Sequence, residues 1–186
     1  MRPSKRDELV RKALEIFYRE GFHATGMDRL AAETGISKTT MFKHFRTKED
    51  LILAVLRLRD EQFRGWLFRR MTEAGPPRAQ LSAMFDALGE WFARPEFRSC
   101  MFIKAASEYP DPAHPIHSQS AEHKRLLFLE TERIARAAGA DDPAALARAL
   151  LLLKEGAIVP AHLGHEADPA GDAKAAAAAL LAGVPA

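Results

Sequence analysis

The segment from Thr25 to Phe45, TGMDRLAAETGISKTTMFKHF, contains two short amphipathic stretches separated by a glycine. In the first stretch, Thr25 is placed to act as the N-cap of a helix, and Asp28 stands three residues later, where a capping-box partner belongs. Gly35 is placed to end that helix, because glycine enters the left-handed backbone region at low cost. The stretch therefore predicts a short helix closed by a glycine.

The second stretch begins at Ser37, which is a favoured N-cap residue. Ile36 precedes this cap and Met41 follows it by four residues, the spacing of a hydrophobic staple that fixes how the chain enters a helix. Two short amphipathic helices joined by a tight turn that contains glycine are typical of a helix-turn-helix. We therefore predict this motif at the centre of an N-terminal three-helix domain.

The second helix is predicted to bury one face and to expose a basic and hydroxyl-rich face. Helical spacing places Met41, His44 and Phe45 inward. The outward stripe consists of Lys38, Thr39, Phe42, Lys43 and Arg46. Cations and hydroxyls on a helix of this kind suit the major groove of DNA, whose phosphates and base edges they can contact. The alternative is an ordinary solvated helix face without a partner.

The composition indicates an all-helical protein. The 186 residues are 47% apolar and 28% charged, with many leucines and alanines and few β-branched residues. Residues 1–48 contain 11 lysines and arginines against 6 acidic residues, an excess of five positive charges, whereas the remainder has an excess of three negative charges. This asymmetry favours a nucleic-acid partner for the N-terminal part only.

We expect a cytoplasmic protein. The first ten residues lack the apolar core of a secretory signal, and no window approaches about 18 uninterrupted apolar residues. A single cysteine, Cys100, excludes an internal disulfide and is consistent with a reducing compartment. Cys100 is either a packing residue or a thiol sensor made reactive by Arg98 and Lys104 nearby in the sequence.

Residues from Leu9 to Leu56 resemble the N-terminal DNA-binding domain of TetR/AcrR-family transcriptional regulators. The resemblance covers about a quarter of the chain. The motifs that carry it are Ile16-Phe17, Gly21-Phe22, Thr25, Leu30-Ala31, Gly35-Ile36-Ser37-Lys38, Met41-Phe42-Lys43-His44-Phe45 and Lys48-Glu49-Asp50-Leu51. This resemblance implies a dimeric, ligand-responsive DNA-binding regulator, in the first place a repressor that a small and largely apolar effector releases from a palindromic operator in double-stranded DNA.

The resemblance also implies roles for individual residues. Thr25, Phe42, His44 and Lys48 would lie near phosphates, while Lys38, Thr39 and Thr40 would meet base edges. Phe42 departs from the usual tyrosine of the family and so lacks a hydroxyl for a phosphate, which favours an apolar contact with a thymine methyl or a sugar. Lys43 stands where a second aromatic residue is usual, and we expect it to supply the phosphate contact instead.

The expected fold class is all-α, with about nine helices. Residues 1–47 would form the helix-turn-helix DNA-binding domain, and residues 48–186 a helical bundle for effector binding and dimerisation, with 48–74 as a connector helix. In this hypothesis effector binding shifts the connector and changes the separation of the two DNA-binding heads. The helix from Pro143 is apolar nearly all round, and the last helix is rich in alanine, so the last two helices are predicted to form a homodimer interface. A buried hairpin in a monomer is the alternative.

Candidate effector-binding residues come from the apolar helices of the second part and from one nearby histidine. They are Phe63, Met84, Phe85, Leu88, Trp91, Met101, Phe102 and His117. Aromatic and methionine side chains of this kind first of all build a core, and a pliable apolar cavity is the more specific hypothesis. Glu108 and Tyr109 are further candidates for polar groups of such a pocket. No cofactor is predicted.

Two other classes of function remain open. A metal-assisted hydrolase would use the histidines 114, 117, 123, 162 and 165, but their spacing fits no usual zinc motif, so neither a metal site nor an enzyme is predicted. The second alternative is an architectural DNA-binding protein of the same fold that responds to no effector. Metal analysis and a screen with apolar compounds would separate these classes.

Overall fold

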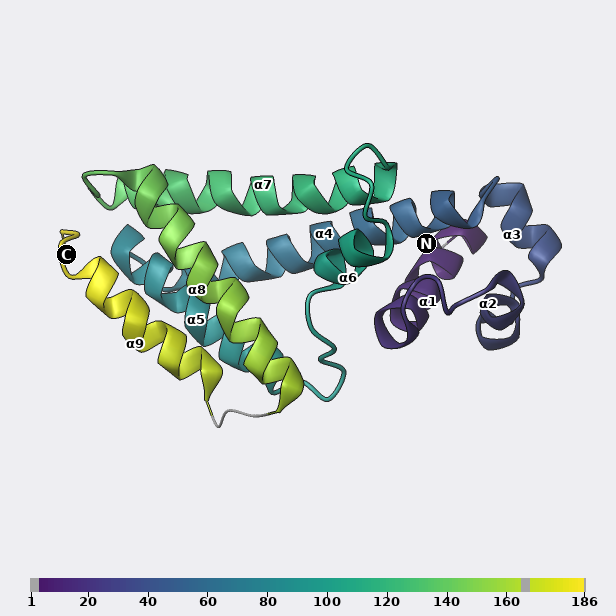
Figure 1. The fold of residues 1–186 in the computed structure, drawn as a ribbon, viewed down its shortest axis with the longest axis horizontal. Coiled ribbons are helices and arrows are strands. Elements are labelled where there is room, and N and C mark those ends of the chain that lie inside the picture. The colour runs from purple at the N-terminus through teal and green to yellow at the C-terminus, as the bar shows by residue number, and fades with distance from the viewer. Residues whose placement is uncertain (1–3, 165–167, 186) are drawn as a thin grey trace. The chain divides into compact units, whose positions relative to one another are not determined.

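The computed structural model describes residues 4–164 and 168–185, and within them the chain is all-helical, as predicted (Figure 1). Nine helices follow one another in these residues. They are α1 (Lys5–Glu20), α2 (Met27–Thr34), α3 (Lys38–His44), α4 (Lys48–Glu73), α5 (Pro77–Phe92), α6 (Met101–Glu108), α7 (Pro115–Ala137), α8 (Pro143–Leu163) and α9 (Pro169–Leu181).

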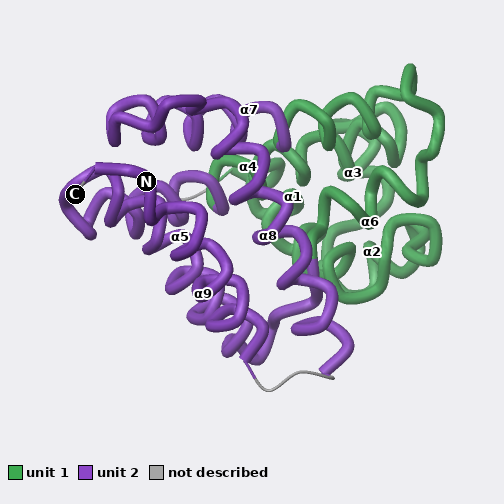
Figure 2. Tube along the Cα trace, turned by 60° about the vertical axis from the view of Figure 1, so that its left-hand side comes forward, with its two compact units in different colours: residues 1–62, 100–123 green, residues 63–99, 124–186 purple. Residues whose placement is uncertain are grey.

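The chain divides into two compact units, each made of two separate segments (Figure 2). Unit 1 contains residues 1–62 and 100–123, and unit 2 contains residues 63–99 and 124–186. Unit 1 therefore holds the predicted helix-turn-helix together with α6 and the first part of α7. This grouping by compactness differs from the functional division after residue 47, which stays a prediction.

The core of unit 1 is built around α1, which packs against α2 and α3, while α2 also packs against α3. The inner face of α1 includes Leu9, Ala13 and Phe17, all fully buried. The ring of Phe22, just after the helix, lies 5.3 Å from that of Phe17. Burial of an aromatic side chain is worth roughly 1.5–3 kcal/mol, so this inner face holds the three short helices together.

The cap predicted at Ser37 is confirmed, and a second side-chain cap begins α4. The Ser37 hydroxyl accepts a hydrogen bond from the Thr40 N–H at 3.2 Å and begins α3. At the start of α4, Thr47 and Asp50 form a reciprocal capping box, each side chain accepting from the backbone N–H of the other at 3.1 Å. The predicted cap at Thr25 is wrong.

Thr25 does not cap α2, because its side chain is buried and bonded to the residues before it. Its Oγ1 donates to the carbonyl oxygen of Gly21 at 2.7 Å, and the side chain is fully buried. The helix begins at Met27 with Gly26 as N-cap, and no side chain accepts from its first N–H groups. The expected capping box with Asp28 is therefore absent, and Asp28 lies in the exposed first turn of the helix.

In unit 2, α5, α8 and α9 pack against one another. Asp142 and Asp168 cap α8 and α9, and each is followed by proline at the first helical position. An aromatic cluster connects α5 to the end of α4, with the Trp91 ring 4.9 Å from that of Phe63. Trp91 also meets Phe97 edge to face at a centroid distance of 4.9 Å.

Unit 2 also contains a lysine that is only 1% exposed, Lys154 in α8. Its ammonium lies 5.7 Å from the centroid of the Phe63 ring and 2.8 Å from the Glu155 carboxylate, which Lys124 approaches at 2.7 Å from α7. Burial alone would raise the pKa of Glu155, but the charges and hydrogen bonds of Lys154 and Lys124 outweigh it and lower that pKa to about 2. Glu155 is therefore ionised at neutral pH and compensates the buried cation.

We predict that Glu155→Gln lowers the free energy of unfolding at pH 7 by about 1–3 kcal/mol. Because the pKa of Glu155 in the folded chain lies below its ordinary value of 4.5, its stabilising effect is present above that value and is lost as the pH falls toward 2. The difference between wild type and variant should therefore shrink over this acidic range. Urea unfolding at a series of pH values measures it, and a difference that does not change with pH would contradict the assignment.

No helix among residues 4–164 and 168–185 is both long enough and apolar enough to cross a membrane.

Candidate nucleic-acid interface

The short helix α3 is anchored in unit 1 by a few apolar side chains. Met41 is fully buried, and Phe45, directly after the helix, is 6% exposed. Ile36, which precedes the cap, is buried as well, as a hydrophobic staple requires. The guanidinium of Arg6 lies over the Phe45 ring at 5.1 Å. These contacts hold one side of α3 and leave the other side to solvent.

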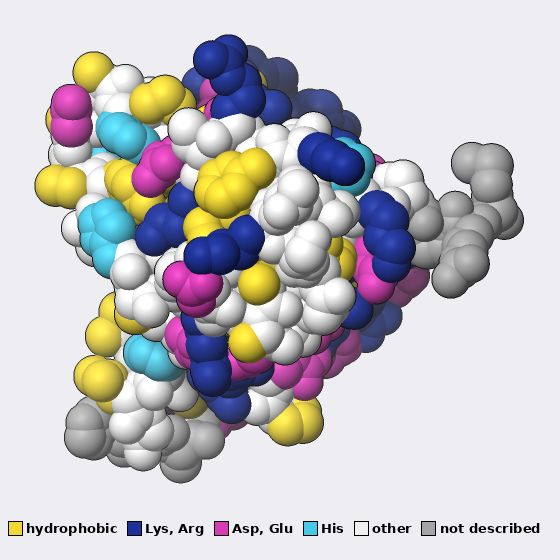
Figure 3. Space-filling model, turned by 90° about the vertical axis from the view of Figure 1, so that its right-hand side faces the viewer, with side chains coloured by type: hydrophobic (Ala, Val, Ile, Leu, Met, Phe, Trp, Pro, Cys, Tyr) yellow, Lys and Arg dark blue, Asp and Glu magenta, His cyan; other side chains and the backbone are white. Residues whose placement is uncertain are grey.

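The outer face of α3 is exposed as the sequence predicted. Lys38, Thr39, Lys43 and Arg46 are all exposed, and Phe42 presents 49% of its surface to solvent. The predicted inward position of His44 is wrong, because its side chain is exposed at the end of the helix. The space-filling view in Figure 3 shows lysine and arginine side chains spread over this face, with exposed hydrophobic, acidic and histidine side chains among them.

The cations of this surface differ in their partners. Lys38 forms an exposed ion pair with Asp28 of α2 at 2.6 Å. Lys43 and Arg46 have no ion-pair partner among the residues that the structure describes. An exposed pair contributes little to stability, so Lys38 can exchange Asp28 for a phosphate at small cost. The surface thus offers two uncompensated cations and one that is weakly held.

Three residues that were predicted to contact DNA have other bonds in this structure. The Thr25 hydroxyl is buried against Gly21, so it is not presented to a phosphate. Lys48 donates from Nζ to the carbonyl oxygens of Phe22 and Thr25, at 3.0 and 3.4 Å. Thr40 is partly exposed, and its hydroxyl lies 3.0 Å from that of the cap residue Ser37.

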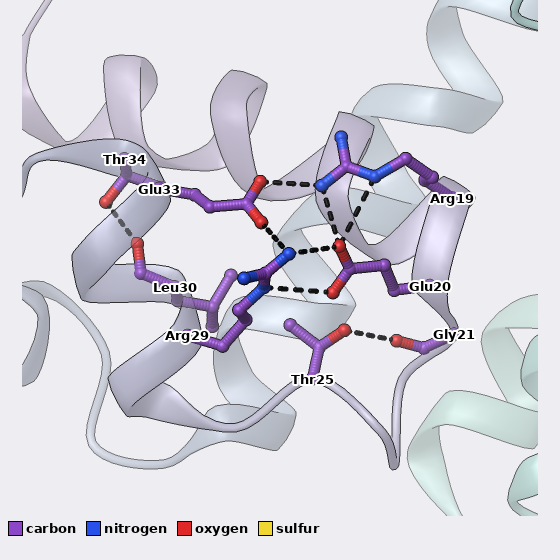
Figure 4. Close-up of polar contacts among 8 residues, drawn as sticks. All are labelled: Arg19, Glu20, Gly21, Thr25, Arg29, Leu30, Glu33 and Thr34. Carbon is purple, nitrogen blue, oxygen red and sulfur yellow. Dashed lines mark hydrogen bonds and ion pairs between the residues drawn. The ribbon is translucent and has the colours of Figure 1, made fainter.

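A network of four charged side chains joins α1 to α2 (Figure 4). Arg19 and Glu20 come from the end of α1, and Arg29 and Glu33 come from α2. Arg29 contacts Glu20 at 3.0 Å, and Arg19 contacts Glu33 at 2.6 Å. Hydrogen bonds from Arg29 and then from Arg19 lower the pKa of Glu20 to about 2. These two arginines therefore stabilise the joint between the helices rather than extending the cationic surface of α3.

Asp28 provides a test of this electrostatic description. Its carboxylate is highly exposed and neutralises Lys38 of the recognition surface. We predict that Asp28→Asn strengthens DNA binding about two- to fivefold, because it removes both the competing partner and a charge that repels phosphates. Fluorescence anisotropy at low salt measures this, and Asp172→Asn, which removes an exposed charge from the first turn of α9, is the control. Weaker binding by Asp28→Asn would contradict the description.

The candidate effector residues lie in both units. Phe63, Met84, Phe85, Leu88 and Trp91 are all buried in unit 2, and three of them, Met84, Leu88 and Phe85, are at most 1% exposed. Met101, Phe102 and His117 belong to unit 1, where Phe102 stacks on the His123 ring at a centroid distance of 3.6 Å. Their role in binding an effector stays a prediction.

The three histidines between residues 114 and 123 have partners other than a metal ion. Nδ1 of His117 lies 2.9 Å from the carbonyl oxygen of Tyr109, and Nδ1 of His114 accepts from the Ile116 N–H at 3.2 Å. Nδ1 of the buried His123 lies 2.7 Å from Asp60. Within the described parts of the chain, no group of three or more histidine, cysteine or acidic side chains is arranged to hold a metal ion. His165 lies outside these parts, and Cys100 is buried.

A three-helix head whose third helix, α3, is exposed and basic defines the class of the protein as a helix-turn-helix regulator of transcription that binds DNA. Residues 9–55 match the family model described as "Bacterial regulatory proteins, tetR family". The chain is 31% identical to SCO4454, a TetR-family transcriptional regulator from Streptomyces coelicolor. Their structures align with a TM-score of 0.90 over 100% of this chain and 92% of that one. The chain belongs to the TetR family.

Curated relatives agree with this family. The transcriptional regulator YjdC of Escherichia coli is 26% identical over 83% of this chain and 81% of its own length. The transcriptional activator FasR of Mycolicibacterium smegmatis is 44% identical over 55 residues, which are 30% of this chain and 25% of FasR. These relatives are regulators of transcription, in agreement with the prediction that the chain is not an enzyme.

Proposed function

We propose that the chain binds a palindromic operator by inserting α3 into the major groove. The observation that supports this most strongly is the outer face of α3, where Lys38, Thr39 and Lys43 are exposed together. Lys43 supplies a phosphate contact, and Lys38 and Thr39 meet base edges. The half-exposed ring of Phe42 lies against a thymine methyl or a sugar. Residues 1–47 serve as the DNA-binding part in this proposal.

A homodimer formed through α8 and α9 would present two such heads. The exposed side of α8 carries Leu152, Val159 and Leu163, which are 73%, 57% and 59% exposed, and α9 adds Leu180 at 42%. A stripe of large apolar groups at helical spacing is costly to leave in water and suits a self-complementary interface. A two-fold dimer places its recognition helices about 34–36 Å apart, one turn of DNA.

The same proposal makes the chain a repressor that a small and largely apolar effector releases, with residues 48–186 binding the effector. There are two separate groups of candidate residues for contacting it, the buried aromatic and methionine residues of unit 2 and the group around Phe102 in unit 1. Displacement of residues 48–74 would then alter the separation of the two heads. An effector that favours the released state by about 1–3 kcal/mol is sufficient for a usable switch. Because the partner is chromosomal DNA, the protein acts in the cytoplasm.

Selection from a pool of random-sequence duplexes tests the proposal. The duplexes should be long enough to hold two half-sites one helical turn apart. We expect the selected sequences to be palindromic and their affinity to fall steeply with salt, as phosphate contacts require. A chain that selects no sequence and ignores duplex DNA even at low salt would refute the proposal.

A reporter placed behind the selected operator decides the direction of regulation. Repression predicts that expression of the protein lowers reporter output and that a thermal-shift hit from a screen of apolar compounds restores it. Higher output on expression would instead indicate activation, the activity that the name of FasR assigns to that relative. The absence of any compound that changes DNA affinity would favour an architectural role.

A further inference from the structure

The loop between α1 and α2 is held by a carboxylate from a distant part of the chain. Both oxygens of Glu108, the last residue of α6, accept from the Phe22 N–H, at 2.9 and 3.0 Å. Oε2 of Glu108 also accepts a short hydrogen bond from the N–H of His23. Hydrogen bonds from backbone N–H groups to an ionised carboxylate are roughly twice as strong as neutral ones. All of these residues belong to unit 1.

A cation holds the same loop through its carbonyl oxygens. Lys48, at the start of α4, donates to the carbonyl oxygens of Phe22 and Thr25. Phe22 therefore has its N–H bonded to a negative side chain and its C=O bonded to a positive one. The Thr25 hydroxyl closes the loop on itself by donating to Gly21. Charged groups from α4 and α6 thus fix the backbone between the first two helices.

Gly21 gives the carboxylate room to approach. Its φ of +90° lies in the region that favours glycine, and a Cβ added at this position would come within 3.0 Å of Glu108 Oε1. A side chain here would therefore strain the backbone and also displace the carboxylate. The glycine and the glutamate lie 87 positions apart in the sequence, and the close approach of the carboxylate depends on the missing side chain at Gly21.

Further contacts hold α6 in place against the same region. Lys104 of α6 donates from Nζ to the carbonyl oxygen of Tyr18 in α1 at 3.4 Å, and its charge lies 5.6 Å from the Tyr18 ring centroid. The Tyr109 ring, next to Glu108, lies 4.6 Å from that of His23. The helix that carries Glu108, α6, is therefore itself bonded to α1, and this keeps the carboxylate beside the loop.

We propose that Glu108 is a positioning residue for DNA binding. Its carboxylate fixes the loop that sets the angle between α1 and α2, and α2 together with the start of α4 flanks the recognition helix α3 along the chain. Glu108 itself touches no DNA, because a carboxylate would repel phosphates. The inference rests on the proposed use of α3 as the recognition helix.

The test compares Glu108→Ala and Glu108→Gln with wild type, and Ser107→Ala, the exposed neighbouring residue in α6, is the control. The probe is a duplex that the wild-type protein has selected from a random pool. We expect Glu108→Ala to bind it about tenfold more weakly, with the salt slope unchanged because the same phosphates are still neutralised. Glu108→Gln should be intermediate, because a carboxamide offers one acceptor oxygen and turns N–H groups toward the loop.

Hydrogen exchange distinguishes a local loosening of the loop from a general loss of stability. The amides of Phe22 and His23 should lose protection in Glu108→Ala, while those in the middle of α1 keep theirs. Should Glu108→Ala fail to fold, Glu108→Gln, which preserves the side-chain volume, decides the question. Gly21→Ala should reproduce both effects, since it displaces the same carboxylate.

Two results would overturn the inference. One is unchanged DNA affinity in variants whose loop amides have become unprotected. The other is weaker binding with a smaller salt slope, which would mean that Glu108 acts on a phosphate contact directly. Wild-type protein that selects no duplex at all would instead refute the proposed function, so the two failures are distinguishable.

Discussion

The double substitution of Lys38 and Lys43 by alanine is expected to weaken binding to the selected duplex about 100-fold at low salt. Both side chains are exposed on the outer face of α3, and Lys43 has no ion-pair partner within the described residues. Each lysine that binds a phosphate releases counterions, so the slope of log affinity against log salt should fall by about 0.9 for each phosphate that is no longer neutralised. Fluorescence anisotropy over a range of salt concentrations measures both quantities.

The two single substitutions should affect DNA binding in different ways. The Lys43→Ala variant should weaken binding to all duplexes about equally, as a phosphate contact does, whereas Lys38→Ala should also relax the sequence preference if it meets a base edge. Arg133→Ala is the matched control, because it removes the same charge from the exposed side of α7 in unit 2. If the control lowers affinity as much as the α3 variants do, general electrostatic attraction accounts for binding and the assigned surface is wrong.

Leu152→Glu is expected to convert the proposed dimer into a monomer. Leu152 is 73% exposed and lies on the apolar stripe of α8, so the substitution leaves the single chain nearly unperturbed. In a dimer joined through α8, the new carboxylate would be buried without a partner, at a cost of several kcal/mol. Size-exclusion chromatography with light scattering measures the mass directly, and affinity for the palindromic duplex should fall because the two heads no longer bind as one unit.

Leu129→Glu in α7 is the control for this prediction. It adds the same charge at another exposed leucine, which is 44% exposed and lies outside α8 and α9. It should leave the mass unchanged. A dimer that survives Leu152→Glu but dissociates with Leu129→Glu would show that the interface lies on α7. A wild-type chain that is a monomer at every concentration would exclude the proposed dimer.

Helix starts with a local cause could be predicted from the sequence. Ser37 and Asp142 stand immediately before their helices and accept from N–H groups three residues later, so neither depends on distant parts of the chain. Thr25 has the same local pattern, yet the prediction there was wrong. The Thr25 side chain is buried and its hydroxyl donates back to the carbonyl oxygen of Gly21, while the helix begins two residues later with Gly26 as N-cap. A capping signal fails where the same side chain is buried and bonded on the other side, even when that bond is to a residue only four positions away.

The positions of the charged residues were less predictable. Helical periodicity correctly predicted that Lys38 and Lys43 are exposed. It wrongly placed His44 inward, because α3 ends at this residue before the face that carries it is covered. Nothing in the sequence indicated that Lys48 would bind backbone carbonyls. The partners of Glu108 lie about 86 residues away, so no short pattern in the sequence could indicate them.

The apolar residues of the second part show a different limit. Met84, Phe85 and Leu88 were predicted to belong to the apolar helices of the second part, and they are buried. Burial alone does not distinguish a packed core from the wall of an effector cavity, because both require the same side chains at the same spacing. A bound molecule, or a change of affinity on adding one, is the observation that separates the two.

The distance in sequence between Glu108 and the loop that it holds has a consequence for biosynthesis. A ribosome makes the first three helices well before it reaches α6. The N–H of Phe22 therefore has no bond to Glu108 until α6 has been synthesised. A chain that stops early, through truncated messenger RNA or proteolysis, would carry the cationic helix without the carboxylate that steadies the head. Incomplete chains should then compete poorly for chromosomal sites, leaving those sites to finished molecules.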